Sequence, residues 1–170
     1  MVLIAKLLTL ALTAAGTPIL RRDAITVEYD VNQRIAPGIS TLSKTGLAGA
    51  VAIHDDLENL VSSVNDATTD TNSAGSLDDE SGAAILADIQ AVMGSLLGVL
   101  SAIENQATAW SSVPGGASLI LGDLQSLNTA FDNFADALTT NGPASLSDEV
   151  TSFKTNLDNA FTSAEAAYSS

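Results

Sequence analysis

Residues 83–103 read AAILADIQAVMGSLLGVLSAI, and this stretch decides the fold. Only Asp88 and Gln90 interrupt the middle of a run of apolar or small side chains. On a helical wheel of about 100° per residue, the large side chains form one stripe, made of Ile85, Ile89, Val92, Leu96, Val99 and Ile103. The opposite side carries small residues, and a helix that is apolar all round is a buried helix. We therefore predict a long, buried helix over residues 77–109.

Four other segments repeat a helical spacing of apolar residues and could cover this helix. They span residues 24–44, 48–67, 120–138 and 145–168. Pro37-Gly38 predicts a kink or a break in the first of them, and residues 68–76 have the composition of a polar linker. Aromatic residues are few, which favours helix over sheet. The sequence thus predicts an all-α fold, a single antiparallel bundle of about five helices with a buried central third helix.

The N-terminal segment has the pattern of a secretory leader. Lys6 precedes a short apolar run, and small residues follow at 13–15, where a signal peptidase would cleave. The run is shorter than the ~20 residues of a membrane span. The next segment ends in Arg21-Arg22, a dibasic pair typical of processing sites. We expect a signal peptide over residues 1–15, a pro-segment over 16–22 and one secreted domain over 23–170.

Charge and composition exclude several classes of function. All twenty acidic residues fall within residues 23–170, which keep three of the six cations. Such a surface repels nucleic acid and anionic membranes. Without cysteine, no disulfide or thiolate metal site is possible. His54, the only histidine, falls on a polar helix face, and no hydrolase, phosphate-loop or metalloprotease motif is present. We expect no catalysis, no cofactor, no metal, no nucleic-acid partner and no transmembrane segment.

Candidate binding residues come from the wheel analysis. Gly94 and Gly98 have the small-xxx-small spacing that allows helices to approach closely, and the same spacing could instead leave room for a ligand. Met and Phe residues at helical spacing are core residues first and pocket lining second. The candidate apolar lining of a lipid site consists of Ile53, Leu57, Met93, Gly94, Leu97, Gly98, Phe131, Phe134, Phe153 and Phe161.

Lys154 is the candidate partner for a ligand carboxylate. On the wheel it lies among Val150, Leu157 and Phe161 and not on the polar face. It could pair with Asp158 one turn on or extend its stem along the rim of the bundle. The functional alternative is an ion pair with a bound fatty acid.

The chain resembles the fungal hydrophobic surface-binding protein A family, also described as cell-wall galactomannoproteins. The resemblance rests on the signal peptide, Arg21-Arg22 before Asp23-Ala24, the absence of cysteine and five helical segments. It also rests on Gly46-Leu47 running into the apolar positions Ala50, Ile53 and Leu57.

The resemblance implies a secreted or wall-associated domain that adsorbs to hydrophobic surfaces. It also implies that a cutinase-like polyesterase could be recruited there, or that fatty acids or sterols occupy a central cavity. Our first hypothesis is a non-enzymatic protein that binds lipids or hydrophobic surfaces through an apolar interior or an exposed apolar face. The alternative is a structural, O-glycosylated cell-wall mannoprotein or antigen without a ligand.

Overall fold

The computed structural model describes residues 24–45 and 50–169. The predicted signal peptide and pro-segment, and the Gly46-Leu47 pair, lie outside the described residues. None of the described residues forms a strand, and the all-α prediction is confirmed. Residues 24–30 are helical and continue into η1 (Val31–Ile35), α2 (Ala36–Thr45), α3 (Ala50–Ala74), α4 (Asp79–Asn105), α5 (Ala107–Ser111), α6 (Gly116–Asn141), η2 (Ala144–Leu146) and α7 (Ser147–Tyr168).

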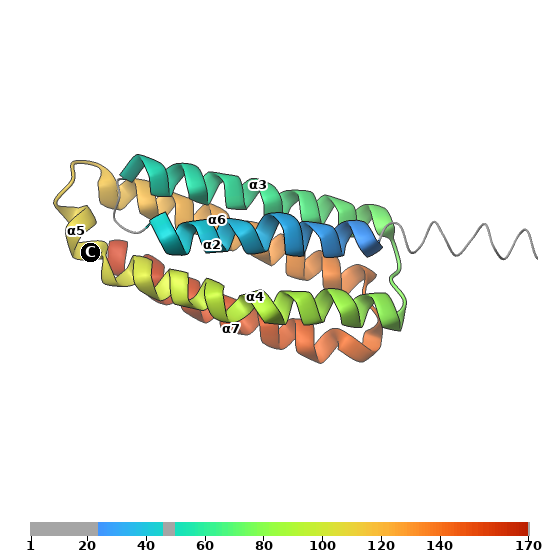
Figure 1. Cartoon of the computed structure of the whole chain (residues 1–170). Coiled ribbons are helices and arrows are strands. Elements are labelled where there is room, and N and C mark those ends of the chain that lie inside the picture. Colours follow the sequence, from blue (N-terminus) through green and yellow to red (C-terminus); the bar gives the residue numbers. More distant parts are fainter. Residues whose placement is uncertain (1–23, 46–49, 170) are drawn as a thin grey trace, which may run out of the picture.

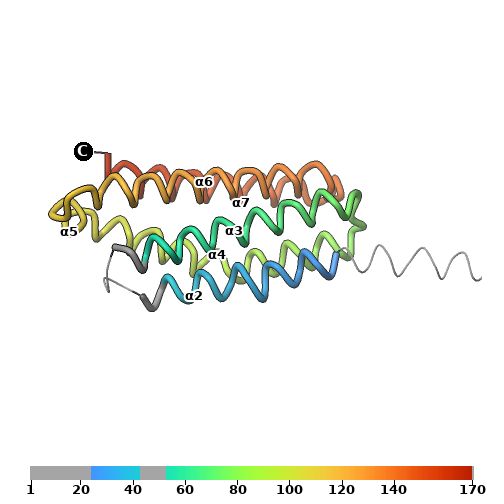
Figure 2. Tube along the Cα trace, turned by 90° about the horizontal axis from the view of Figure 1, so that it is seen from above, coloured from blue at the N-terminus to red at the C-terminus, as the bar shows by residue number. Residues whose placement is uncertain are grey.

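The long helices form a ring. Helix α2 packs on α3, α3 on α6, α6 on α7, α7 on α4, and α4 on α2 again. Consecutive long helices run in opposite directions, and α2 lies on the front of the bundle where α3 and α4 flank it (Figures 1 and 2). The apolar stripes meet inside this ring, where large side chains such as Leu57, Leu96 and Phe134 are less than 3% exposed. The ring therefore encloses one apolar interior.

The first helix does not break at Pro37-Gly38. Instead, the turn before it widens into the π-helix η1, in which the Ala36 N–H donates to the Val31 carbonyl five residues earlier. Proline has no N–H to continue the ordinary pattern, and a wider turn accommodates that loss within a continuous helix. Residues 24–45 therefore act as one helical element, here called the N-terminal helix, which contacts both α3 and α4.

Helix α4 buries its bulky stripe but exposes its small face. Ile85, Ile89, Leu96, Val99 and Ile103 are at most 6% exposed. On the other side, the residues exposed to solvent include Ala87, Ala91, Gly94, Gly98 and Ala102. This differs from the prediction of a central helix buried all round, because each helix of a five-membered ring keeps an outward face. Small residues make that face apolar without large exposed side chains.

By length and composition, α4 is the one described helix that could cross a membrane. Its most apolar window has a mean hydropathy of 1.8, and 33% of that window is buried. A helix from the wall of a helical bundle has the same properties, so this is weak evidence for a span. Its contacts with α7, α2 and η1 give it a place within the bundle.

The predicted linker over residues 68–76 is wrong for most of its length, because α3 continues to Ala74. The hydroxyls of Thr68, Thr69, Thr71 and Ser73 each donate to the carbonyl four residues earlier, which satisfies them within the helix. Helix α4 then begins after Asp78, whose carboxylate accepts the Ser81 N–H at 2.8 Å. Asp78 is therefore the N-cap of α4.

Candidate functional site

A groove of about 370 Å³ lies where α2, α3 and α4 meet. Its lining comes from the end of α2, the start of α3, the second half of α4 and the C-cap of α4, with the residues Leu42, Ile53, Ser95, Gly98, Val99, Ala102, Ile103 and Gln106. We call it the Gly98 groove. Its volume is in the range of about 300–1,000 Å³ that small-molecule sites occupy.

The floor of the Gly98 groove belongs to the core of the protein. Leu42, Ile53, Val99 and Ile103 are 4–7% exposed and pack into the same cluster as the fully buried side chains. A molecule in the groove would therefore touch the outer layer of the core directly. The polar lining residues are Ser95 and Gln106, which offer a hydroxyl and an amide for hydrogen bonds.

Gly98 is one reason that this groove is open. A Cβ atom added at Gly98 would meet no atom within 4 Å, and the same is true of Gly94. The pair therefore does not serve close packing between helices, because both positions face open space. The two positions differ in one respect, since Gly98 lines the groove and Gly94 is exposed outside it.

The other predicted lining residues do not converge on the groove. Leu57 and all four phenylalanines are buried in the interior, and the Phe131 and Phe161 ring centroids are 6.3 Å apart. Met93 and Leu97 are partly buried against the core. Of the ten predicted residues, the structure brings Ile53 and Gly98 together at the groove, with the phenylalanines deeper in the bundle.

Lys154 is held by carboxylates of α6. Its ammonium pairs with Asp132 and lies 4.0 Å from Asp136. Burial works against its charge, but the hydrogen bond and charge of Asp132 outweigh that cost and raise the pKa of Lys154. The expected pair with Asp158 is therefore replaced by pairs across the α6–α7 interface. A fatty-acid carboxylate would have to compete with these groups.

His54 is not the solvated surface residue that its helix face predicts. Its Nδ1 lies 2.9 Å from both carboxylate oxygens of Asp123 on α6, and its Nε2 lies 3.6 Å from Glu58. The hydrogen bond with Asp123 raises the pKa of His54, and the charges of Asp123, Glu58 and Asp55 act in the same direction. Burial raises the pKa of Asp123 even though His54 opposes that shift.

Asp123 could have been found from the sequence. It lies three residues after Ile120 and four before Leu127, so it occupies the apolar stripe of its helix, and a charge there needs a partner.

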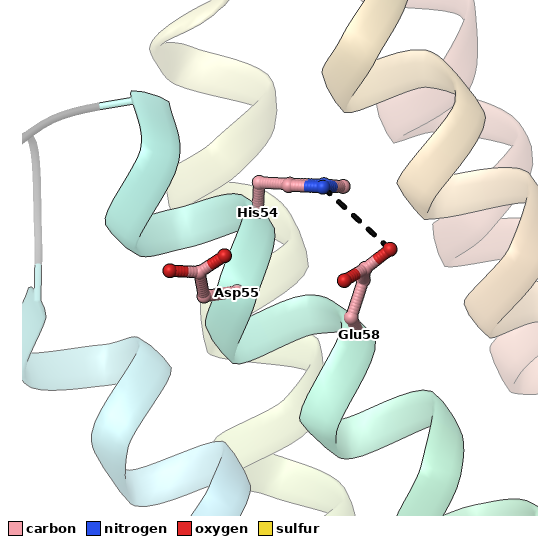
Figure 3. A group of neighbouring side chains, drawn as sticks. All are labelled: His54, Asp55 and Glu58. Carbon is pink, nitrogen blue, oxygen red and sulfur yellow. Dashed lines mark ion pairs between the residues drawn. The ribbon is translucent and has the colours of Figure 1, made fainter.

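Figure 3 shows that His54 and Glu58 face one another on successive turns of α3. One ligand atom from each of His54, Asp55 and Glu58 can lie within 4.8 Å of the others, which is the spacing of a loose metal site. Both ring nitrogens of His54, however, already face a carboxylate. An imidazolium between Asp123 and Glu58 accounts for the arrangement, and we interpret it as an ion-pair network that joins α3 to α6.

The same ring of helices is found in helical domains of known structure. Ligand binding domain 1 of the Penicillium marneffei MP1 protein, complexed with arachidonic acids, superposes with a TM-score of 0.79. It is 13% identical and covers 86% of this chain and 99% of its own. Ligand binding domain 2 of the same protein, in complex with arachidonic acids, is 12% identical, with a TM-score of 0.72 over 87% of this chain and 93% of its own. At these identities the likeness shows the fold.

AfMP4p in complex with palmitic acid is 25% identical, with a TM-score of 0.71 over 90% of this chain and 99% of its own. No curated protein matches the sequence. The model of the family described as hydrophobic surface binding protein A matches residues 26–140. The chain therefore belongs to the hydrophobic surface binding protein A family.

Proposed function

We propose that this protein is secreted and binds a long-chain lipid, a fatty acid or a sterol, without catalysing a reaction. The observation that carries the proposal is the Gly98 groove, which is open to solvent and has a floor made of core side chains. Its family, and the similar structures complexed with arachidonic and palmitic acids, support the same ligand class.

The groove and the interior have different parts in this proposal. Each methylene that an acyl chain buries contributes about 0.8 kcal/mol, so burial of the chain would supply most of the affinity. The groove would take the first part of the chain, near Ser95 and Gln106. The deeper part would pass among the buried Leu57 and the phenylalanines, whose side chains would have to move aside.

Gly98→Leu tests the groove, with Gly94→Leu as its matched control. Both replace an exposed glycine of the same helix, and both positions have open space for a Cβ. The gain in helix propensity is therefore the same. We expect Gly98→Leu to weaken the binding of palmitate by about tenfold or more, which corresponds to about 1.4 kcal/mol. We expect Gly94→Leu to bind palmitate as the wild type does, and equal effects of the two variants would contradict the site.

Lipid extraction and mass spectrometry of the protein from its own host test the function without a chosen ligand. About one co-purifying fatty acid or sterol per chain supports the lipid carrier. An empty protein that still depletes from solution onto polyester beads supports adsorption to hydrophobic surfaces. A protein that does neither would support the alternative of a structural, O-glycosylated wall mannoprotein.

Lys154 remains the proposed partner for a ligand carboxylate, now in competition with Asp132 and Asp136. Under this proposal, Lys154→Ala weakens the binding of a fatty acid but not of its methyl ester. Equal weakening of both ligands would refute the contact and leave the apolar site in place.

We also propose that the protein is located outside the cell or in the wall and that it recruits a cutinase-like hydrolase to an apolar substrate. Fractionation of the host culture checks the location. Recruitment predicts that the protein increases the rate at which such a hydrolase degrades polyester particles but not a soluble ester. An equal effect on both substrates would contradict it.

A further inference from the structure

Asp30 is a buried carboxyl group on the N-terminal helix. The residue is 2% exposed and lies directly before the π-helix η1. Its Oδ1 accepts a hydrogen bond from the Arg34 Nη1 at 3.2 Å. Its Oδ2 is buried and has no hydrogen-bond donor within reach. Burial without a donor is unfavourable for a carboxylate oxygen, so this atom needs an explanation.

The carboxyl of Asp70 on α3 lies beside Asp30. A carboxylate only accepts hydrogen bonds, so two ionised carboxylates cannot satisfy one another. One proton between them would give the Asp30 carboxyl a second hydrogen bond and remove the repulsion. Burial, followed by the hydrogen bond with Asp70, raises the pKa of Asp30 to about 6, although Arg34 opposes the shift.

The other charged groups around this site are Arg34, Asp66, Asp88 and Glu28. Arg34 on the N-terminal helix also binds Asp66 of α3 at 2.8 Å. On the side of α4, the carboxylate of Asp88 accepts a hydrogen bond from Asn32 at 2.6 Å. Burial and the charge of Asp88 raise the pKa of Glu28, which therefore changes in the same direction as Asp30 with pH.

The N-terminal helix connects this proton to the lipid site, with Asp30 twelve residues, or about 18 Å along the helix, before Leu42. The N-terminal helix closes the ring between α3 and α4, and its residue Leu42 lines the Gly98 groove. A change that loosens the whole helix from α3, as far as Leu42, would open the ring and expose the apolar interior.

We propose that a proton shared by Asp30 and Asp70 holds the N-terminal helix against α3, so that the bundle opens more readily as the pH rises. The sign follows from the raised pKa of Asp30. An acid with a raised pKa stabilises the fold while it is protonated, and this stabilisation is lost as the pH rises from the ordinary value of 3.8 through about 6. The opening of the helix is a property of the protein alone, and its effect on a ligand rests on the proposed lipid binding.

Hydrogen exchange of the N-terminal helix in the ligand-free protein tests the proton shared by Asp30 and Asp70, here called the latch. We expect the opening constant, corrected for intrinsic exchange, to rise between about pH 4.5 and about pH 7.5 by tenfold to about a hundredfold, since each pKa unit corresponds to about tenfold. Amides of α6 provide the internal reference. In Asp30→Asn, the new amide can donate to Asp70 at every pH, so opening should remain slow and largely lose its pH dependence.

Asp148→Asn is the matched control, because Asp148 is exposed on α7. It should retain the pH dependence of the wild type. A wild type without pH dependence, or an Asp30→Asn variant with unchanged pH dependence, would overturn the latch.

Release of methyl palmitate, a ligand without a titrating group, then measures the effect on binding. A release rate that rises with pH in the wild type but not in Asp30→Asn supports control of the lipid site. A rate independent of pH in a protein whose helix opens would overturn that control. Failure to bind any lipid would instead count against the proposed function, while the exchange experiment would still test the latch.

Discussion

Tyr168 joins the end of α7 to α4 through a hydrogen bond, and removing its hydroxyl tests how much this contact near the groove stabilises the fold. Its hydroxyl donates to the Ile103 carbonyl at 2.6 Å, and the residue is 5% exposed. That carbonyl also accepts the Gln106 N–H at 3.0 Å, so it keeps a partner when the tyrosine hydroxyl is removed. We therefore expect Tyr168→Phe to lose the net value of one hydrogen bond, about 1 kcal/mol, without the full cost of an unpaired carbonyl.

Urea denaturation followed by circular dichroism measures this difference, and about 1 kcal/mol corresponds to a fall in Tm of roughly 2–4 °C for a domain of this size. Tyr29→Phe is the control, because Tyr29 is 59% exposed, and it should change stability by less than about 0.5 kcal/mol. Burial raises the pKa of Tyr168 to about 12, so its neutral form stabilises the fold and this contribution is lost as the pH rises from 10 to about 12. The advantage of the wild type over Tyr168→Phe should shrink in that range. Equal effects of the two tyrosine variants at neutral pH would refute the reasoning.

Two further predictions concern Gly82 and His54. A Cβ at Gly82 would lie 2.7 Å from the Cδ of Pro143, so Gly82→Ala should destabilise the fold by about 1–3 kcal/mol. Gly122→Ala, in open space on α6, should stabilise it by up to about 1 kcal/mol, and the same sign for both in urea denaturation would contradict this account. The hydrogen bond with Asp123 raises the pKa of His54, so the stabilisation is complete below the ordinary value of 6.5 and is lost as the pH rises through the folded value. Stability of the wild type should therefore fall as the pH rises above about 6.5, while His54→Gln should show a flatter profile; parallel profiles would show that the pair contributes nothing.

The fold could be predicted because apolar stripes repeat at helical spacing over most of the chain. The sequence predicts a linker over residues 68–76, because Thr, Asn, Asp and Ser normally compete with helix hydrogen bonds. In the structure, Ala67 and Thr71 are buried on one face of α3, and that burial extends the helix beyond its local preference. The composition of a segment does not show which face of it a neighbouring helix covers, so it could not predict that residues 68–74 are helical.

The site could be predicted only in part, because its members come from three helices. Gly98 and Ile53 were identified from the spacing within their own helices, but nothing in either helix shows that they meet. Asp30 and Asp123 were missed, although each lies close to an apolar stripe, because their partners are 40 and 69 residues away in the sequence. A carboxylate at a core position predicts a partner but does not identify it.

The outward face of α4 would connect the proposed lipid binding with adsorption to hydrophobic surfaces. Between Asp88 and Glu104 the exposed residues of α4 are Ala, Gly, Ser and Gln, whereas the exposed positions of α7 include Asp148 and Glu149. Charged groups keep their water and oppose contact with an apolar surface, so the face of α4 has the lower cost of desolvation. Gly98 belongs both to this face and to the groove. A hydrophobic surface in contact with the outward face of α4 would therefore lie beside the opening of the Gly98 groove. A lipid could pass from that surface into the groove without crossing the acidic exterior.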